Sequence, residues 1–169
     1  MTAAPGPCAA ICALTLSGLP SDRFLFAGFP PSAQGARRSF LEELAGVQAT
    51  LILYESPKRL GALLSDMAGV LGGDRKAVVC RELTKRFEEV LRGTVATLVA
   101  DVETREIKGE IVVLVDRAAP AEATEESIGA ALDAALQSMS VKDAATFVSQ
   151  TLGVPRKIAY KIALDRNQG

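Results

Sequence analysis

LILYESPKR, residues 51–59, is the stretch that decides the fold. Its apolar run ends abruptly at the carboxylate of Glu55, and Ser56-Pro57 follows. Serine is a favoured helix N-cap and proline suits the first helical position, so the pattern predicts a buried strand followed by a helix. In open α/β sheets, ligands bind outside the carboxyl ends of the strands, near such turns. Glu55, Lys58 and Arg59 are therefore candidates for chemistry or binding, with a surface salt bridge as the alternative.

The composition predicts one folded domain, or one domain with a small appendage. The chain has 169 residues, 49% of them hydrophobic, and its 19 basic and 20 acidic residues give a formal net charge of −1. Because the charge is nearly balanced, any basic binding site has to be local. No run approaches the ~18 apolar residues of a membrane span, and no basic segment typical of a signal peptide precedes the apolar run 8–16. We expect a cytoplasmic protein without a membrane partner.

The chain contains no histidine, which excludes histidine-based triads and histidine metal ligands. Its three cysteines, Cys8, Cys12 and Cys80, lie in apolar surroundings and form no CxxC motif. They are typical of small core residues in a reducing compartment. We therefore predict no metal site.

Strands and helices are predicted to alternate along residues 1–117. Apolar or aromatic runs predict strands over 51–55, 21–29, 77–80, 87–91 and 111–115. Periodic segments predict helices over 8–17, 37–44, 57–71 and about 94–102. Buried strands separated by helices predict an α/β fold, with a mixed, mostly parallel sheet flanked by helices.

Charged residues and glycine cluster at the ends of the predicted strands. Arg81 and Glu82 directly follow strand 77–80, and Gly109-Glu110 precedes strand 111–115. Glu55, Glu82 and Glu110 are the better acid–base candidates because all three lie at strand edges. A local ion pair between Arg81 and Glu82 is the alternative.

Beyond Asp116 the sequence changes character. Residues 118–126, AAPAEATEE, predict a linker, and residues 127–169 predict three short helices that resemble a helix-turn-helix module. Ser140 is the expected cap of the second helix, and Gly153 is its expected end. A modest basic face on the third helix favours an anionic partner, with a solvated rim on a small bundle as the alternative. That face consists of Arg156, Lys157 and Lys161.

The common nucleotide-binding and nucleophile motifs are absent, namely GxGxxG, GxxxxGKS/T and GxSxG. From the residues alone, the prediction stops at an α/β domain with a ligand site at its strand ends and a helical tail.

Six motifs in order resemble one family across essentially the whole chain: PGPCAA, SGLPSDRF, GFPP, LILYESPKR, CRELTK and GEIVVLV. They are similar to the bacterial methyltransferases that modify a cytidine 2′-hydroxyl in small-subunit ribosomal RNA. That family belongs to the tetrapyrrole-methylase-like, S-adenosylmethionine-dependent enzymes. The resemblance implies two α/β domains with the methyl donor between them, and this sequence looks like the C-terminal domain only. It therefore implies a missing N-terminal domain as partner, and an isolated chain that is inactive or nearly so.

The resemblance also implies roles for particular residues. Contacts to the donor are expected from Cys8, Ala9, Tyr54, Glu55, Leu83, Gly109 and Glu110. Relatives have serine or threonine where this chain has Cys8. A ribose hydroxyl has a pKa far above neutral, so a general base is expected, with Glu55 and Glu82 as candidates. Residues expected to hold RNA phosphates are Arg37, Arg38, Lys58, Arg59, Arg81 and Lys85.

The expected partners are small-subunit ribosomal RNA, or the ribosomal subunit, and a second copy of the chain. A lobe separated from its enzyme should expose apolar surface around residues 8–19, which favours a homodimer. Two other functions stay open. A tetrapyrrole-precursor methylase fits the superfamily, but YESPKR, RELTK and the helical tail argue for the RNA branch. A non-catalytic RNA- or protein-binding module would use the same strand-end residues without binding a methyl donor.

Overall fold

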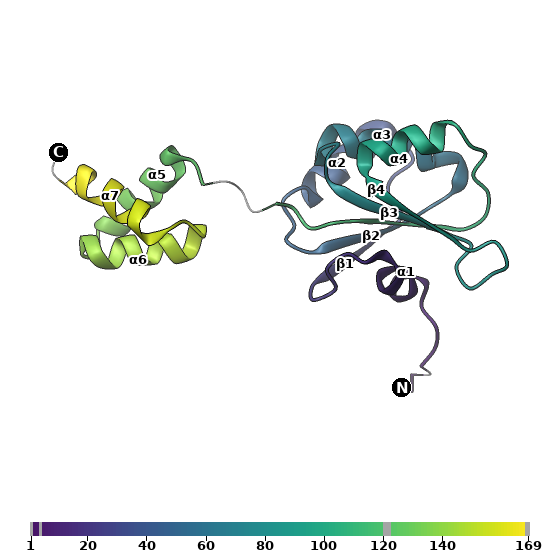
Figure 1. Cartoon of the computed structure of the whole chain (residues 1–169), viewed down its shortest axis with the longest axis horizontal. Helices are drawn as coiled ribbons and strands as arrows, with labels where there is room; N and C mark the ends of the chain where they lie inside the picture. The colour runs from purple at the N-terminus through teal and green to yellow at the C-terminus, as the bar shows by residue number, and fades with distance from the viewer. Residues whose placement is uncertain (1, 4, 120–122, 168–169) are drawn as a thin grey trace. The chain divides into compact units, whose positions relative to one another are not determined.

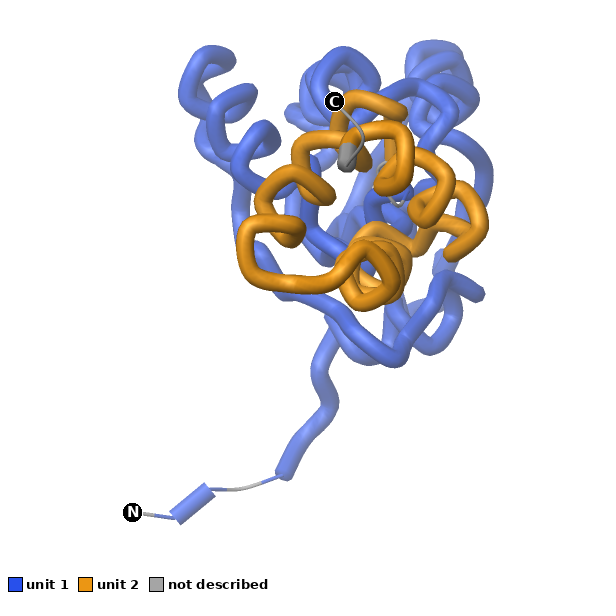
Figure 2. Tube along the Cα trace, turned by 90° about the vertical axis from the view of Figure 1, so that its left-hand side faces the viewer, with its two compact units in different colours: residues 1–120 blue, residues 121–169 orange. Residues whose placement is uncertain are grey.

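The computed structural model describes residues 2, 3, 5–119 and 123–167. The chain divides into two compact units, residues 1–120 and residues 121–169, coloured blue and orange in Figure 2. Among the described helices, none is long and apolar enough to cross a membrane.

The first unit is built on a five-stranded sheet with the strand order β1-β2-β5-β3-β4. The strands are β1 (Phe24–Gly28), β2 (Thr50–Glu55), β3 (Lys76–Arg81), β4 (Glu89–Thr94) and β5 (Ile111–Val115). All five residues of the central strand β5 are buried, as expected for a strand covered on both faces. The edge strands β1 and β4 have only half-buried or exposed residues.

The sheet is mixed, as predicted, but the prediction that it is mostly parallel is wrong. Of the four strand pairs described, β1 and β2 are parallel and the other three are antiparallel. β2 and β3 do run in the same direction, as expected for strands joined by a crossover helix. However, β5 lies between them and runs antiparallel to both. An apolar run has the same pattern in either direction, so its sequence did not reveal this insertion.

Three helices cover one face of the sheet and one helix covers the other (Figure 1). The three are α2 (Gln34–Leu44), α3 (Pro57–Leu71) and α4 (Val95–Glu103), and the single helix is α1 (Ala9–Ser17). Side chains alternate across a strand, so Leu53 of β2 packs under α2–α4 while Ile52 packs against α1. The small residues Ala10 and Ala13 form part of the buried face of α1. This helix therefore lies close to the strands.

Capping residues set the element boundaries largely where the sequence predicted them. Ser56 is the N-cap of α3 and Pro57 is its first residue. Thr94 caps α4, because its hydroxyl accepts from the Thr97 N–H and the Thr97 hydroxyl accepts from the Thr94 N–H. Gly18 ends α1 with a left-handed φ of 74°. The predicted strands 21–29 and 87–91 correspond to the observed strands β1 and β4, with shifted ends.

The second unit consists of α5 (Glu125–Leu136), α6 (Val141–Leu152) and α7 (Arg156–Asn167). The three helices share their own core, which includes Leu132, Val148 and Ala159. Ser140 caps α6, as predicted, and Gly153 ends it with a φ of 67°. Of the predicted linker 118–126, residues 120–122 lie outside the described residues, and α5 begins at Glu125.

Candidate functional site

A cavity of about 410 Å³ opens where β2 ends and β5 begins. Because these strands are antiparallel neighbours, Glu55 at the end of β2 pairs with Ile111 at the start of β5. This pairing brings the turn at Gly109-Glu110 beside the turn at Glu55. The cavity is lined by Ala9, Phe29, Tyr54, Glu55, Ser56, Pro57, Gly109, Glu110, Ile111 and Val112.

Five of the seven residues expected to contact a methyl donor line this one cavity. They are Ala9, Tyr54, Glu55, Gly109 and Glu110, and they come from three separate segments of the chain. Cys8 is the N-cap of α1 and directly precedes the lining residue Ala9 in the sequence. Leu83 does not line the cavity, since it packs against the core beneath α1.

Glu55 is a buried carboxylate at this site, with a side chain that is 1% exposed. Its Oε1 accepts a 2.7 Å hydrogen bond from the Ser56 N–H. Its Oε2 lies 3.0 Å from Nη2 of Arg59, but that nitrogen donates to the Pro30 carbonyl at 2.5 Å. Oε2 therefore has an ion-pair partner but no hydrogen bond from any described residue. The salt bridge that was the alternative at this strand end is thus observed, but its Glu55 partner is buried and not on the surface.

Glu82 holds in place the Gly109-Glu110 turn, which forms one wall of the cavity. Its Oε1 accepts from the Glu110 N–H and from Nζ of Lys85, both at 3.0 Å, and its N–H donates to the Glu110 carbonyl at 3.0 Å. The hydrogen bond from the Glu110 backbone, followed by that from Lys85, lowers the pKa of Glu82. A lower pKa makes a carboxylate a weaker proton acceptor. The turn after β3 is strained, with positive φ at Glu82 (51°) and Thr84 (63°).

Tyr54 joins the cavity to α1. Its ring makes edge-to-face contacts with Phe26 and Phe29, at centroid distances of 4.8 and 5.5 Å. Burial, followed by the charge interaction with the Cys8 thiol, raises the pKa of its hydroxyl. Hydrogen bonds from the backbone of Ile11 and Ala10 lower the pKa of Cys8. Cys8 is the N-cap residue of α1, but its side chain makes no capping hydrogen bond of the kind that serine or threonine commonly makes there.

Arg37 does not offer its charge to RNA, and the prediction that it does is corrected. Its side chain is 6% exposed, and its Nε and Nη2 each lie 2.7 Å from Oδ2 of Asp66. This basic residue in the first turn of α2 does have an anionic partner, but the partner is internal. Arg38 lies 3.5 Å from the same carboxylate and remains 44% exposed.

Three more of the predicted phosphate contacts are engaged within the chain. Arg59 pairs with Glu55, Arg81 pairs with Glu89 at 2.6 Å, and Lys85 bridges Glu82 and Glu110. Arg81 therefore forms a local ion pair, which was the alternative to a ligand contact, but its partner is Glu89 and not Glu82. Within the described part of the chain, Lys58 alone of the six predicted basic residues has no acidic partner within 4.0 Å. It is exposed in the first turn of α3, two residues from the cavity wall at Ser56.

The sequence did not identify the apolar walls of the cavity. Phe29, Pro57, Ile111 and Val112 line it, and Phe29 is 68% exposed. The available signal was the position of Phe29 directly before Pro30-Pro31, where a strand has to end. Ile111 and Val112 were expected in the core, and no pattern showed that the start of β5 also faces a cavity.

Comparison with known proteins identifies the family. The sequence profile of the family described as Tetrapyrrole (Corrin/Porphyrin) Methylases matches residues 1–99, more than half of the chain. The chain belongs to this family. The profile described as RsmI C-terminal HTH domain matches residues 121–167, which form the helical unit.

Relatives within this methylase family extend the match to nearly the whole chain. A protein of Xylella fastidiosa (strain 9a5c), named Ribosomal RNA small subunit methyltransferase I, is 44% identical over 163 residues, covering 95% of this chain and 60% of that protein. A protein of the same name from Erythrobacter litoralis is 46% identical over 165 residues, covering 98% and 58%. The chain thus spans about 60% of the length of these relatives.

Solved structures support the fold of the α/β unit. The cobalt precorrin-4 methyltransferase CbiF superposes with a TM-score of 0.52 at 19% identity, covering 66% of this chain and 50% of that one. CobJ, also a methyltransferase, gives a TM-score of 0.50 at 16% identity. At these identities the likeness shows the methylase fold alone.

Proposed function

We propose that the chain is the C-terminal part of an S-adenosylmethionine-dependent methyltransferase that modifies a cytidine 2′-hydroxyl in small-subunit ribosomal RNA. The observation that carries the proposal is the cavity between β2 and β5, where five of the seven expected donor contacts meet. The names of the relatives at 44–46% identity support the RNA substrate. They favour it over the tetrapyrrole-precursor methylase that the family description alone would also fit.

The residues of the cavity suit one end of S-adenosylmethionine. Its walls are mainly apolar, as expected where a purine ring packs, and Gly109 and Glu110 offer backbone atoms at one side. Oε2 of Glu55 is a buried acceptor without a hydrogen bond from the described residues, so it fits a ligand hydroxyl or amino group. When bound, the donor supplies a methyl group on a positively charged sulfur.

The two candidate bases fit positioning roles better than proton transfer, and the expectation of a general base at either is revised. Glu55 is buried and tied to Ser56 and Arg59, while Glu82 is tied to Glu110 and Lys85. In this proposal Glu55 orients the donor and Glu82 fixes the Gly109-Glu110 wall. Methyl transfer then relies chiefly on alignment of the ribose hydroxyl, which can supply a large part of a rate enhancement.

The proposal includes an N-terminal lobe and a second copy of the chain. The relatives are longer than this chain, and their remaining length would complete the donor site. On the edge strand β1, Phe24, Leu25 and Phe26 are exposed and suit a homodimer contact. Exposed apolar surface was expected over residues 8–19, but the large apolar side chain exposed there is Ile11. β1 exposes more apolar surface than this segment does. A cytoplasmic location follows from a ribosomal substrate.

A non-catalytic RNA-binding module remains the second candidate. It is favoured by the internal ion pairs of Glu55 and Glu82, because these pairs explain both carboxylates without a role in proton transfer. The two functions differ in donor binding, which only the methyltransferase requires.

Isothermal titration of S-adenosylmethionine into the 169-residue chain tests the proposal. Ala9 is an exposed alanine on the cavity wall, so Ala9→Phe fills the cavity without altering the core. We expect the parent to bind the donor and Ala9→Phe to bind at least about tenfold more weakly. Ala100→Phe, at an exposed alanine of α4 outside the cavity, is the matched control and should bind like the parent. Equal binding by all three chains contradicts this site. Binding by a full-length relative but not by the parent rules out a donor site formed by this chain alone.

A further inference from the structure

The helical unit carries basic side chains without acidic partners, unlike most of the basic residues described above in the α/β unit. Arg156, Lys157 and Lys161 lie within the first two turns of α7 and are exposed. In the described part of the chain, none of the three has an acidic partner within 4.0 Å. Nε of Arg156 donates to the Thr146 hydroxyl at 2.9 Å, which fixes the direction of its guanidinium. Basic groups at a helix start are unfavourable without an anion, as Arg37 and its partner Asp66 illustrate in α2.

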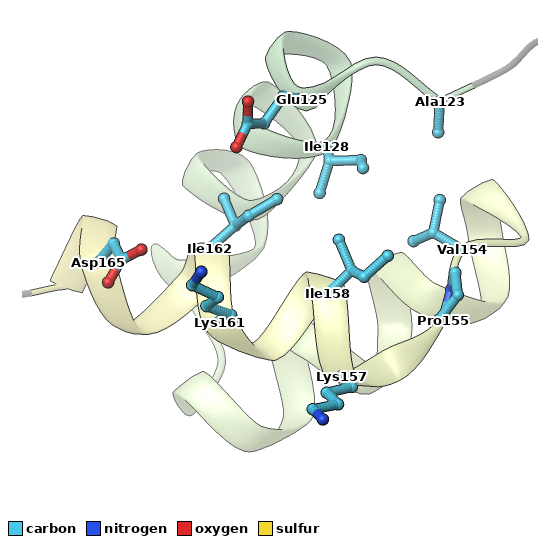
Figure 3. A pocket seen from close by; sticks show the side chains of 10 residues that line it. All are labelled: Ala123, Glu125, Ile128, Val154, Pro155, Lys157, Ile158, Lys161, Ile162 and Asp165. Carbon is cyan, nitrogen blue, oxygen red and sulfur yellow. The ribbon is translucent and has the colours of Figure 1, made fainter.

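A hollow of about 710 Å³ lies beside these basic residues, between the start of α5 and α7 (Figure 3). Ile128 of α5 and Ile158 and Ile162 of α7 supply apolar walls, and Val154 closes one end. Ile158 is 48% exposed, so it adds apolar surface at the hollow. This volume is within the range of small-molecule sites.

The charges around the hollow are divided. Lys157 and Lys161 are one helical turn apart on α7, Asp165 lies one further turn along the same helix, and Glu125 lies on α5 across the hollow (Figure 3). A polyanion would therefore follow the lysines and avoid the carboxylates. Glu125 and Asp165 suit groups that donate hydrogen bonds, such as the amino groups of bases.

We propose that this hollow binds single-stranded RNA, with unstacked bases against its apolar walls and backbone phosphates on Lys157 and Lys161. The proposal rests on the RNA substrate of the proposed function, but it assigns RNA binding to the helical unit instead of the strand ends. The deep, narrow major groove of duplex RNA does not admit side chains, whereas single strands expose base faces. A lysine ammonium is a compact charge that suits phosphates, and its stem can pack along a base.

Fluorescence anisotropy with a labelled single-stranded RNA 12-mer of mixed sequence tests the proposal on the 169-residue chain. For Lys157→Gln/Lys161→Gln we expect about a tenfold loss of affinity at low salt. The slope of log affinity against log salt should also become shallower by about 1.4, since each lost phosphate contact removes about 0.7. Ile158→Ser should weaken binding without changing that slope. Lys142→Gln, at an exposed lysine of α6 outside the hollow, should bind RNA like the parent.

Unchanged affinity in the double variant overturns the proposal and leaves the hollow to a protein partner. An equal loss in Lys142→Gln also overturns it, because the effect would then be one of overall charge. The donor titration is independent of both results. A chain that binds S-adenosylmethionine but whose RNA affinity does not depend on Lys157 and Lys161 refutes this RNA site alone. Equal donor binding by the parent and Ala9→Phe refutes the proposed donor cavity without bearing on the RNA site. A parent that fails to bind the donor where a full-length relative binds it rules out only a donor site formed by this chain alone.

Discussion

The carboxylate of Glu82 occupies the space that a side chain on Gly109 would need. A Cβ atom on residue 109 would lie 2.3 Å from Oε1 of Glu82, and Gly109 has a φ of 94°. The turn that forms one wall of the cavity is therefore held by two residues far apart in the sequence. A side chain at position 109 would therefore require the Glu82 carboxylate to move.

Gly109→Ala should destabilise the chain by about 1–3 kcal/mol, because alanine is strained at this φ and displaces Glu82. Donor affinity should fall more than stability alone explains, since the cavity wall moves. Gly46→Ala is the control, because an added Cβ there would have no neighbour within 4 Å and its φ is not positive. Thermal unfolding and donor titration measure both effects. Equal behaviour of the two variants would show that Glu82 does not hold the turn.

Cys8 should be the fastest cysteine to react with iodoacetamide. Backbone hydrogen bonds from Ile11 and Ala10 lower its pKa, so its thiolate forms at a lower pH than that of an ordinary cysteine. Burial raises the pKa of Cys80 to about 11, so Cys80 should react slowest. Peptide mass spectrometry after timed alkylation between pH 6.5 and 9 gives the order. The fast phase should vanish in Cys8→Ser, and faster labelling of Cys80 in the folded chain would contradict the prediction.

Asp66→Asn should be among the most destabilising single changes in the α/β unit. It leaves the Arg37 guanidinium buried without its countercharge, which costs about 3–5 kcal/mol. Replacing both members, as in Arg37→Met/Asp66→Leu, should restore much of that loss. The chain has two tyrosines and no tryptophan, so a Tyr160→Phe background allows urea unfolding of this unit to be followed through Tyr54. Asp74→Asn, at an exposed aspartate, should change stability by less than about 0.5 kcal/mol. A comparable loss there would refute the buried-pair explanation.

Glu89 should make the α/β unit sensitive to acid. Its carboxylate accepts from Arg105 at 2.7 Å and from Arg81 at 2.6 Å, and these bonds lower its pKa below the ordinary value of 4.5. The stabilisation is therefore complete above about pH 4.5 and is lost as the pH falls through the folded-state pKa. Glu89→Gln should lower the melting temperature at pH 7. On further acidification, the melting temperature of the variant should fall less than that of the parent. Circular dichroism measures the melting temperature at each pH. A parallel fall of the melting temperature in parent and variant would contradict this prediction.

Local chemistry made much of the fold predictable. Thr94 and Ser140 begin helices because their hydroxyls accept from backbone N–H groups, and Pro57 begins one because its fixed φ suits the first helical turn. Gly18 and Gly153 end helices because they adopt a left-handed conformation that other residues resist. The strand order was not predictable in the same way. Nothing in the run Ile111–Val115 specifies which two strands it will join, or in which direction.

The candidate site was predictable in position but not in detail. The strand-end rule brought Tyr54, Glu55 and Gly109 to one cavity. It did not show that Arg37 would be neutralised by Asp66, because that partner lies 29 positions away on another helix. Charges near a strand end were interpreted as contacts to a ligand, whereas most of them pair with one another. The partner of a charged side chain is a tertiary property that sequence spacing does not encode.

The place of β5 in the sheet has a consequence for biosynthesis. Val113 pairs with Leu53 on one side and with Val79 on the other, although β5 is the last strand of its unit to be synthesised. Until Val115 has left the ribosome, β2 and β3 have no common neighbour, and the edge of each strand that faces β5 has no hydrogen-bonding partner. The sheet therefore closes late in translation, through contacts between distant parts of the chain. The nascent chain should accordingly depend on chaperones until its central strand arrives.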